Sequence, residues 1–305
     1  MAMSTTIAFL GPAGTFTEAA LQAFAPRFSA VEPVAVDSPS AALRAVREGR
    51  ADYACVAIEN SVDGAVTATY DALVEGRPVQ IYWEVDLPVS FSIMTRPGMQ
   101  LCDVASFSTH PVAYQQVRGW LQDHLPAVEY VPASSNAAAA EAVARGEVDA
   151  AAAPARAAEL FGLDTLSSEV ADVKGATTRF VLVGPAGKPT ERTGQDRTSV
   201  IFTLPNEPGS LVGALEEFAH RGVDLSRIES RPTRQGLGIY RFHTDLIGHI
   251  EDQPVAEALR ALWLRAQELI FVGSWPSATQ LGEAPRDLNR LAAADAWIAS
   301  ARSGR

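Results

Sequence analysis

The sequence predicts an α/β protein in which a two-lobed first domain is followed by a smaller domain of βαββαβ order. Three observations lead to this prediction. The chain has 305 residues, which is more than one ordinary core usually covers. Two pairs of segments within the first 180 residues match at one constant spacing. After a polar linker, the alternation of apolar strands and amphipathic helices starts again.

The internal repeat has a spacing of 97 positions. Residues 38–57 lie over 135–154, and each segment reads as a Ser N-cap, an amphipathic helix, a Gly at the helix end and a buried strand. The same spacing lays residues 7–24 over 104–121, and both read as a strand, a turn and a helix. Each half is therefore predicted to be a βαβ-type lobe with a mostly parallel sheet. Such lobes bind small ligands beyond the carboxyl ends of their strands.

The domain boundaries are predicted from the point where the alternation of strands and helices starts again. Residues 1–187 form the two-lobed domain, and residues 188–197, which are polar and contain Gly and Pro, form the linker. Residues 198–275 read as strand, helix, two strands, helix and strand, which is the ferredoxin-like order. Residues 276–305 are a tail with an Ala-rich, helix-compatible end and no motif.

Composition excludes several classes of partner. The net charge of −11 argues against nucleic acid or an anionic membrane surface. The absence of an apolar run of about 18 residues, and of a basic start before an apolar segment, predicts a cytoplasmic protein. Cys55 and Cys102 stand in apolar stretches and are expected to be reduced core thiols. Five scattered histidines make a metal site an unfavoured interpretation.

Positive potential is scarce in the first domain. Residues 1–195 carry 13 basic and 22 acidic side chains, so an anionic ligand there needs helix N-termini or a few arginines. The turn in GPAGTFTEAAL has Gly14, which allows a close backbone approach, and Thr15, which starts an S/T-x-x-E capping box. The matching turn, STHPVAYQQ, offers Thr109, His110 and, about one turn later, Gln115. An ordinary strand-to-helix turn remains the alternative at both places.

Two further stretches place polar groups at strand ends. VAIENSVDGAV closes a buried strand with Glu59, Asn60 and Ser61, for which a helix N-cap is the alternative reading. TTRFVLVG begins a strand with Thr177, Thr178 and Arg179. If the chain crosses back to the first lobe there, a hydroxyl beside a guanidinium can donate a hydrogen bond to a leaving group while the cation holds an anion. An edge strand with solvated threonines is the alternative.

Together these motifs resemble the prephenate dehydratase family over about residues 5–275. Six stretches stand in the family's order: GPAGTFTEAAL, VAIENSVDGAV, STHPVAYQQ, TTRFVLVG, PGSLVGAL and IESRPTR. The resemblance implies a first domain like the type-2 periplasmic binding proteins, an active site between the lobes and no cofactor. It also implies a C-terminal ACT domain that binds phenylalanine as a feedback inhibitor, and a homo-oligomer, expected to be a tetramer formed as a dimer of dimers.

The resemblance also assigns residues. The family's essential threonine falls on Thr178, with Arg179 and Thr177 beside it as catalytic candidates. Its substrate-binding candidates are Gly14, Thr15, Glu59, Asn60, Ser61, Thr109, His110, Gln115 and Phe180. Its effector-binding candidates are Pro208, Gly209, Ser210, Leu211, Val212, Glu229, Ser230, Arg231 and Pro232. Two departures stand out, because Ala176 replaces an Asn found in many members and Ser210 replaces a usual Ala.

The reaction expected from this resemblance is the decarboxylating dehydration of prephenate to phenylpyruvate in phenylalanine biosynthesis, a carbon–oxygen lyase reaction. In this hypothesis Thr178 assists the leaving hydroxyl, and Arg179 holds carboxylates together with N–H groups at the Thr15 and Thr109 turns. Two other interpretations remain open. One is a non-catalytic small-molecule sensor, and the other is a preference for arogenate, the amino-acid analogue of prephenate.

Overall fold

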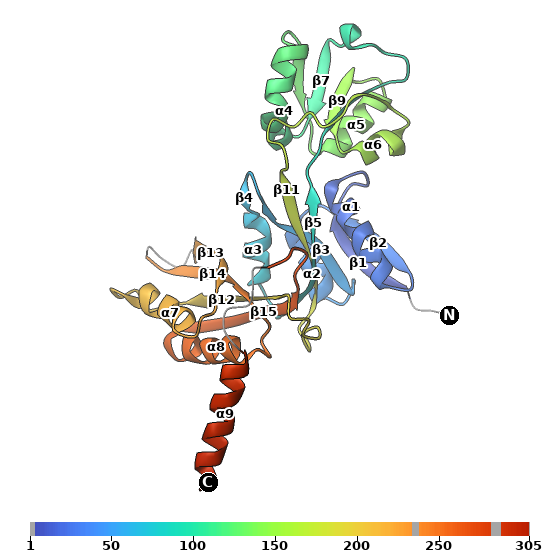
Figure 1. The fold of residues 1–305 in the computed structure, drawn as a ribbon. Helices are drawn as coiled ribbons and strands as arrows, with labels where there is room; N and C mark the ends of the chain where they lie inside the picture. The colour runs from blue at the N-terminus through green and yellow to red at the C-terminus, as the bar shows by residue number, and fades with distance from the viewer. Residues whose placement is uncertain (1–3, 234–237, 282–287, 305) are drawn as a thin grey trace. The chain divides into compact units, whose positions relative to one another are not determined.

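The computed structural model describes residues 4–233, 238–281 and 288–304, with the side chains of 288–292 outside the description. The chain divides into two compact units, Met1–Gly187 and Lys188–Arg305 (Figure 1), and each is described by itself. The first unit contains two lobes, each built on its own sheet.

The first lobe is formed mainly by residues 5–88. Its elements are β1 (Thr5–Leu10), α1 (Phe16–Phe24), the 3-10 turn η1 (Ala25–Arg27), β2 (Val31–Val36), α2 (Pro39–Arg47), β3 (Tyr53–Asn60), β4 (Gly64–Ala65), α3 (Thr67–Leu73) and β5 (Val79–Pro88). The strand order is β2-β1-β3-β11-β5, with β4 paired to β3. Helix α1 buries Leu21 and Phe24 against Ile7, Phe9 and Leu182 of this sheet. Full burial of one such side chain stabilises the fold by about 2–3 kcal/mol.

The second lobe follows without a break. Its elements are β6 (Ser92–Thr95), the 3-10 turn η2 (Leu101–Asp103), β7 (Ser106–Thr109), α4 (Pro111–His124), β8 (Glu129–Pro132), α5 (Asn136–Ala144), β9 (Ala150–Ala153), α6 (Ala155–Phe161) and β10 (Asp164–Ser167). The strand order is β10-β6-β9-β7-β8.

The predicted repeat is confirmed by topology. Strands β2-β1-β3 in one lobe and β8-β7-β9 in the other have the same parallel order. Helices α2 and α5 both begin after a capping serine, Ser38 or Ser135, whose hydroxyl accepts a backbone N–H three residues later. Each is followed by a glycine with positive φ, Gly49 at 70° and Gly146 at 75°. The sheets are mixed rather than mostly parallel, because β5 and β11 in one and β6 and β10 in the other pair antiparallel.

Strand β11 (Thr177–Pro185) returns from the second lobe into the first sheet, which is the condition under which the sequence placed its entrance at the cleft. It lies between β3 and β5, so it is an inner strand and not an edge strand. Figure 1 shows β5 and β11 side by side, with β5 running toward the second lobe and β11 running back from it. The crossing therefore places the Thr-Thr-Arg entrance of β11 beside the end of β3.

The second unit has the predicted βαββαβ order. Its elements are β12 (Asp196–Thr203), α7 (Ser210–Ala219), β13 (Leu225–Pro232), β14 (Tyr240–Ile247), α8 (Gln253–Arg265) and β15 (Glu268–Pro276), and the sheet order is β13-β14-β12-β15. Its core joins both helices to the sheet through Phe202, Phe218, Leu246 and Leu262. Helix α9 (Leu288–Arg302) occupies the tail.

Two smaller expectations have mixed outcomes. Cys55 is a buried free thiol as expected, but Cys102 is exposed, so its assignment to a core was wrong. Within the described residues, no helix combines the length and the apolar character that a membrane crossing requires.

Candidate active site

Thr178, at the start of β11, faces Asn60, at the end of β3. Asn60 Nδ2 donates a hydrogen bond of 2.8 Å to Thr178 Oγ1. The amide cannot flip without loss, because Asn60 Oδ1 accepts the backbone N–H groups of Val62 (2.8 Å) and Asp63 (3.0 Å). Thr178 is therefore the acceptor in this bond. Its own proton has no protein acceptor in the described part of the chain, so it is available to a ligand.

The neighbouring residues tie the two strand ends together. Ser61 N–H donates to the carbonyl of Thr177, and Thr177 N–H donates to Ser61 Oγ, both over 2.9 Å. The Thr178 side chain is buried within this arrangement, with the residue 8% exposed. Two motifs that are 118 positions apart at their central contact are thus brought into one site, as the sequence suggested.

Arg179 is surrounded by carboxylates of the protein itself. Its Nη1 lies 3.0 Å from Glu59 Oε2, and its Nε lies 3.0 Å from Asp86 Oδ1 and 3.7 Å from Glu84 Oε2. Burial acts to lower the pKa of Arg179, but Glu84, Asp86 and Glu59 outweigh burial and hold the pKa above its usual value. The guanidinium therefore stays charged and is held on three sides.

This geometry favours a role for Arg179 that differs from the expected one. A guanidinium can make bidentate bonds to a bound carboxylate only if its N–H groups are available. Here the Arg179 side chain is 18% exposed, and those of Glu84 and Asp86 are 0% and 15% exposed. Arg179 and its three carboxylate partners together carry an excess of negative charge, which does not favour binding of an anionic ligand. Arg179 fits better as the residue that fixes β11 between β3 and β5.

The turn between β1 and α1 is built much as its sequence indicated. Thr15 caps α1 by accepting the N–H of Glu18 (3.3 Å), and Glu18 accepts the N–H of Gly14 (2.6 Å). These N–H groups therefore already have protein acceptors. Gly14 has a φ of 84°, and an added Cβ would lie 3.3 Å from Leu160 of the second lobe. Glycine at position 14 thus suits both the positive φ and the close packing of this turn against the second lobe.

The matching turn of the second lobe also uses its polar groups internally. Thr109 is fully buried, and its hydroxyl donates to the carbonyl of Ala152 (2.8 Å). This position makes it a structural residue rather than a ligand contact. His110 is the N-cap of α4, where its Nδ1 accepts the N–H of Val112 (3.3 Å). In the neutral ring the proton is then on Nε2, which can donate to a ligand.

Gln116, and not the expected Gln115, faces the site. Gln115 is exposed, whereas Gln116 is 6% exposed and its Nε2 donates to Asp63 Oδ2 over 3.0 Å. Its Oε1 is buried without a hydrogen-bond partner in the described structure. Gln116 shares the buried face of α4 with Ala113 and Val117, and this helical spacing indicates that Gln116 rather than Gln115 points inward. A helix start at Pro111 would have been enough to choose between the two glutamines.

Two other positions are part of cores. Phe180 is 2% exposed and packs in the core of the first lobe, so its expected contact with substrate has no support in this geometry. Ala176, where many family members have Asn, is 3% exposed and packs in a core cluster of the second lobe. Nothing polar replaces the missing amide at that position.

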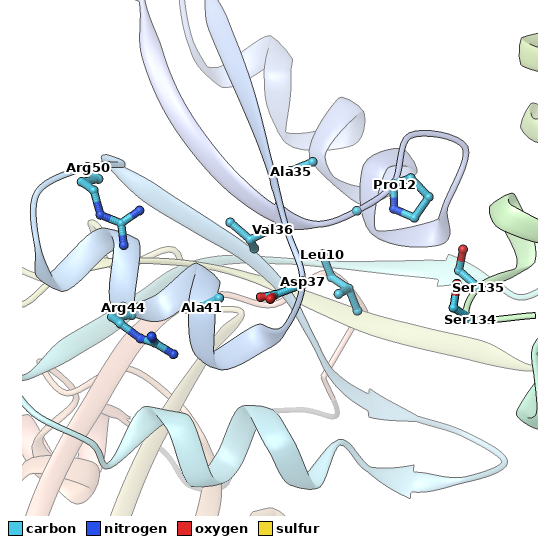
Figure 2. Close-up of a pocket in the computed structure, with 11 residues that line it drawn as sticks. Leu10, Pro12, Ala35, Val36, Asp37, Ala41, Arg44, Arg50, Ser134 and Ser135 are labelled. Atoms are coloured by element: carbon cyan, nitrogen blue, oxygen red, sulfur yellow. The ribbon is translucent and has the colours of Figure 1, made fainter.

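A separate cavity of about 720 Å³ spans the two lobes near the ends of β1 and β2. Figure 2 shows Leu10 and Asp37 from the first lobe on one part of its wall and Ser134 and Ser135 from the second lobe on another. Thr178, Asn60 and Arg179 do not line it. The first-lobe wall of this cavity includes the ends of β1 and β2, whereas Thr178 and Asn60 lie where β11 and β3 meet.

The two effector motifs lie at the same end of the second unit's sheet, with β14 between the strands β13 and β12. Arg231 pairs with Arg241, and Arg241 pairs with Thr203, the last residue of β12. The segment after β12 contains Pro208 and leads to Gly209, which caps α7 with a φ of 83°. The remaining candidates are Ser210, Leu211 and Val212 in the first turn of α7, and Glu229, Ser230 and Pro232 at the end of β13.

The fold and the site together define a two-lobed α/β domain that carries a hydroxyl–amide pair where β3 and β11 meet, joined to a ferredoxin-like domain. The family model of prephenate dehydratase matches residues 7–188, and that of the ACT domain matches 198–264. The chain belongs to the prephenate dehydratase family, which is a family of carbon–oxygen lyases. The predicted fold class is confirmed.

Known proteins support this placement across the whole chain. The chain is 57% identical to a prephenate dehydratase of Corynebacterium glutamicum over 307 aligned residues, covering 99% of this chain and 98% of the relative. A crystal structure of prephenate dehydratase from Arthrobacter aurescens in complex with L-Phe is 43% identical, covers 98% of this chain and 100% of its own, and has a TM-score of 0.89. A solved structure described as GqqA, a novel type of quorum quenching acylase, is 32% identical over 89% of this chain and 98% of its own, with a TM-score of 0.79.

Proposed function

We propose that the protein converts prephenate to phenylpyruvate, carbon dioxide and water at the Thr178–Asn60 pair. The observation that carries this proposal is the direction of the 2.8 Å hydrogen bond, which leaves the Thr178 proton available to a ligand. Membership of the prephenate dehydratase family supplies the reaction class.

The reaction needs help at one oxygen atom. The carbon–carboxylate bond breaks, its electron pair enters the ring, and the bond from the ring to its hydroxyl oxygen breaks with the electrons leaving on that oxygen. One proton is consumed, so that the dianion yields the phenylpyruvate anion, carbon dioxide and water. Aromatisation drives the process, and the developing hydroxide is the charge that the enzyme must stabilise.

Thr178 is placed to stabilise that charge. A threonine hydroxyl is a weak acid, so its contribution is a hydrogen bond to the leaving oxygen that strengthens as the carbon–oxygen bond breaks. A donor of this kind is worth about 10²–10³ in kcat in other enzymes. Asn60 preorganises this donor, because its Nδ2 donates to the oxygen of the Thr178 hydroxyl and leaves the hydroxyl proton for the substrate.

Arg179 and Glu59 are the strand neighbours of Thr178 and Asn60, and their ion pair holds the two strands together next to the Thr178–Asn60 hydrogen bond. Glu59 precedes Asn60, Arg179 follows Thr178, and their ion pair of 3.0 Å lies beside the Asn60–Thr178 hydrogen bond. We assign Arg179 to positioning, and we assign ligand contacts to His110 Nε2, as a donor to a carboxylate, and to Gln116 Oε1, as an acceptor for a ligand hydroxyl.

The proposal extends to regulation and assembly. Phenylalanine acts as the allosteric effector at the end of the second unit's sheet where 208–212 and 229–232 lie, in line with the L-Phe complex of the Arthrobacter aurescens relative. The protein assembles as a tetramer, a dimer of dimers, in the cytoplasm. Sedimentation with and without phenylalanine tests the assembly.

The test is phenylpyruvate formation from prephenate by the purified protein, read by absorbance in alkali, with and without phenylalanine. Thr178→Val removes the hydroxyl at nearly constant shape, and Thr178→Ser is the matched variant that keeps it. We expect Val to lower kcat by about 10² or more and Ser to retain most of it. Turnover of arogenate alone would revise the substrate, and ligand binding without any product would favour a sensor. Equal kcat for Val and wild type would remove Thr178 from the mechanism.

A further inference from the structure

One hydrogen bond joins the second lobe to the loop that holds Asn60. Gln116 projects from α4, and its Nε2 donates to Asp63 Oδ2 over 3.0 Å. Asp63 lies in the exposed loop between β3 and β4 of the first lobe. The two residues are 53 positions apart, so this contact reports on how the lobes meet.

The same loop determines how Asn60 is oriented. The backbone N–H of Asp63 donates to Asn60 Oδ1 over 3.0 Å, and the Nδ2 of that amide donates to Thr178. An unbroken series of contacts therefore runs from Gln116 through Asp63 and Asn60 to the Thr178 hydroxyl. If the loop moves, the amide loses one of the two bonds that fix its orientation.

Helix α4 also holds the segment that enters β11. The carbonyl of Gln116 accepts the N–H of Asp172 over 2.6 Å, and the Asp172 carboxylate accepts the N–H of Gly119 at 2.9 and 3.1 Å. The segment after Asp172 leads directly to Thr178. Helix α4 is thus bonded both to the Asp63 loop, which follows Asn60, and to the Asp172 segment, which leads to Thr178. A shift of the second lobe therefore acts on both residues of the Asn60–Thr178 contact.

We propose that Asp63 is a positioning residue and that its bond to Gln116 is a latch, which couples closure of the two lobes to the orientation of the Thr178 hydroxyl. The proposal rests on the function proposed above and adds a condition to it. When the latch is formed, Asn60 keeps the Thr178 proton directed at the substrate. When the lobes separate, the amide and the hydroxyl are no longer held in register.

Kinetics can separate a latch from a general structural role. Asp63→Ala removes the acceptor and should lower kcat about tenfold with a smaller change in KM. Asp63→Asn keeps an oxygen acceptor for Gln116 and should restore kcat to within about threefold of wild type. Asp123→Ala is the control, since it removes an exposed carboxylate from the same helix as Gln116. If Asp63→Asn is as slow as Asp63→Ala, the charge and not the hydrogen bond matters, and the latch is refuted.

A second comparison asks whether Asp63 acts through Thr178. In the Thr178→Val background there is no hydroxyl to orient, so Asp63→Ala should change the remaining kcat by less than about twofold. The same tenfold loss in both backgrounds would show that Asp63 acts independently and would overturn the proposal. So would an unchanged kcat for Asp63→Ala in the wild-type background.

Hydrogen exchange provides a readout that does not depend on the reaction. The N–H groups of Val62 and Asp63 donate hydrogen bonds to Asn60, so a peptide covering 61–64 should exchange several-fold faster in Asp63→Ala than in Asp63→Asn. If wild type fails to turn over prephenate but this difference is seen, the proposed function fails and the latch stands. If exchange is equal in the two variants, the latch fails whatever the activity.

Discussion

Replacing Asn60 with aspartate keeps the shape of the side chain and reverses one hydrogen bond. One oxygen of the new carboxylate can still accept the N–H groups of Val62 and Asp63. The other oxygen now stands where Nδ2 stood, 2.8 Å from Thr178 Oγ1, and an ionised carboxylate has no proton to donate. Thr178 must then donate its own proton to residue 60, and the leaving oxygen of the substrate loses its donor.

The expected loss follows from that single bond. Removing one donor to a developing oxyanion costs about 10²–10³ in kcat, which is about 2.7–4 kcal/mol of transition-state stabilisation. Asn60→Asp should therefore be nearly as slow as Thr178→Val although it retains the hydroxyl. The loss should also depend on pH. As pH falls toward the pKa of the new carboxyl, about 3.9 when unperturbed, the neutral acid donates to Thr178 again, and kcat should rise by up to tenfold per pH unit.

The assay is kcat for prephenate between pH 8 and pH 5.5, with an enzyme-free blank at every pH. Wild type and Thr178→Val are measured in parallel, because neither contains the new carboxyl. Asn60→Ala serves as a further control, since it removes the amide without introducing a titrating group. Near wild-type turnover by Asn60→Asp at pH 8 would show that the direction of this bond is irrelevant. A pH profile parallel to that of Asn60→Ala would refute the orientation argument.

Other expectations concern stability and support of the site. Arg179→Lys should lower kcat about tenfold and lower Tm, because a point charge cannot serve three carboxylates at once, and paired kinetics and thermal melts check both effects. Gly14→Ala should lower the free energy of unfolding in urea more than Gly49→Ala, because both have positive φ but only Gly14 faces an atom of the other lobe within 4 Å. Burial, followed by nearby arginines, lowers the pKa of His243 to about 3. The unfolded state binds this proton below about pH 6.5, so stability due to neutral His243 is present above that pH and falls as pH drops toward 3, by at most about 1.4 kcal/mol per unit. His243→Gln should flatten that part of a stability–pH curve.

The fold was predictable because its signals are local or repeated. Ser38 and Ser135 cap helices at equivalent places, and Gly49 and Gly146 follow those helices, so two weak patterns at one spacing became a strong one. The return of β11 to the first lobe was only considered as a condition, and the sequence did not reveal that it would be an inner strand. The sequence did not predict the antiparallel pairing within each sheet. That pairing depends on where the chain crosses between the lobes, and it produces no periodic pattern in the sequence.

The site was less predictable because the partners of each side chain come from residues that are distant in the sequence. Arg179 looked like an anion-binding residue next to Thr178, but Glu84 and Asp86 reach it from β5, whose register with β11 cannot be read from either segment. Gln115 and Gln116 differ only by one position, and the start of α4 decides which of them is buried. Residue types at strand ends therefore indicated where chemistry lies, while the partner of each side chain required the structure.

The duplication also gives a reason why the proposed chemistry lies in one lobe. Both lobes have the same three-stranded parallel core, and both place a capped helix after the first strand. Only in the first lobe does a later strand enter the sheet next to the third strand of the repeat and bring a threonine to its end. In the second lobe the corresponding strand, β9, pairs there with β6, and the register places Ser92 of β6 opposite Ala153, which has no amide side chain to pair with the hydroxyl. In the proposed mechanism the catalytic asymmetry comes from the crossing of β11, and the matching turn and helix of the second lobe contribute the proposed ligand contact of His110 and the proposed latch of Gln116.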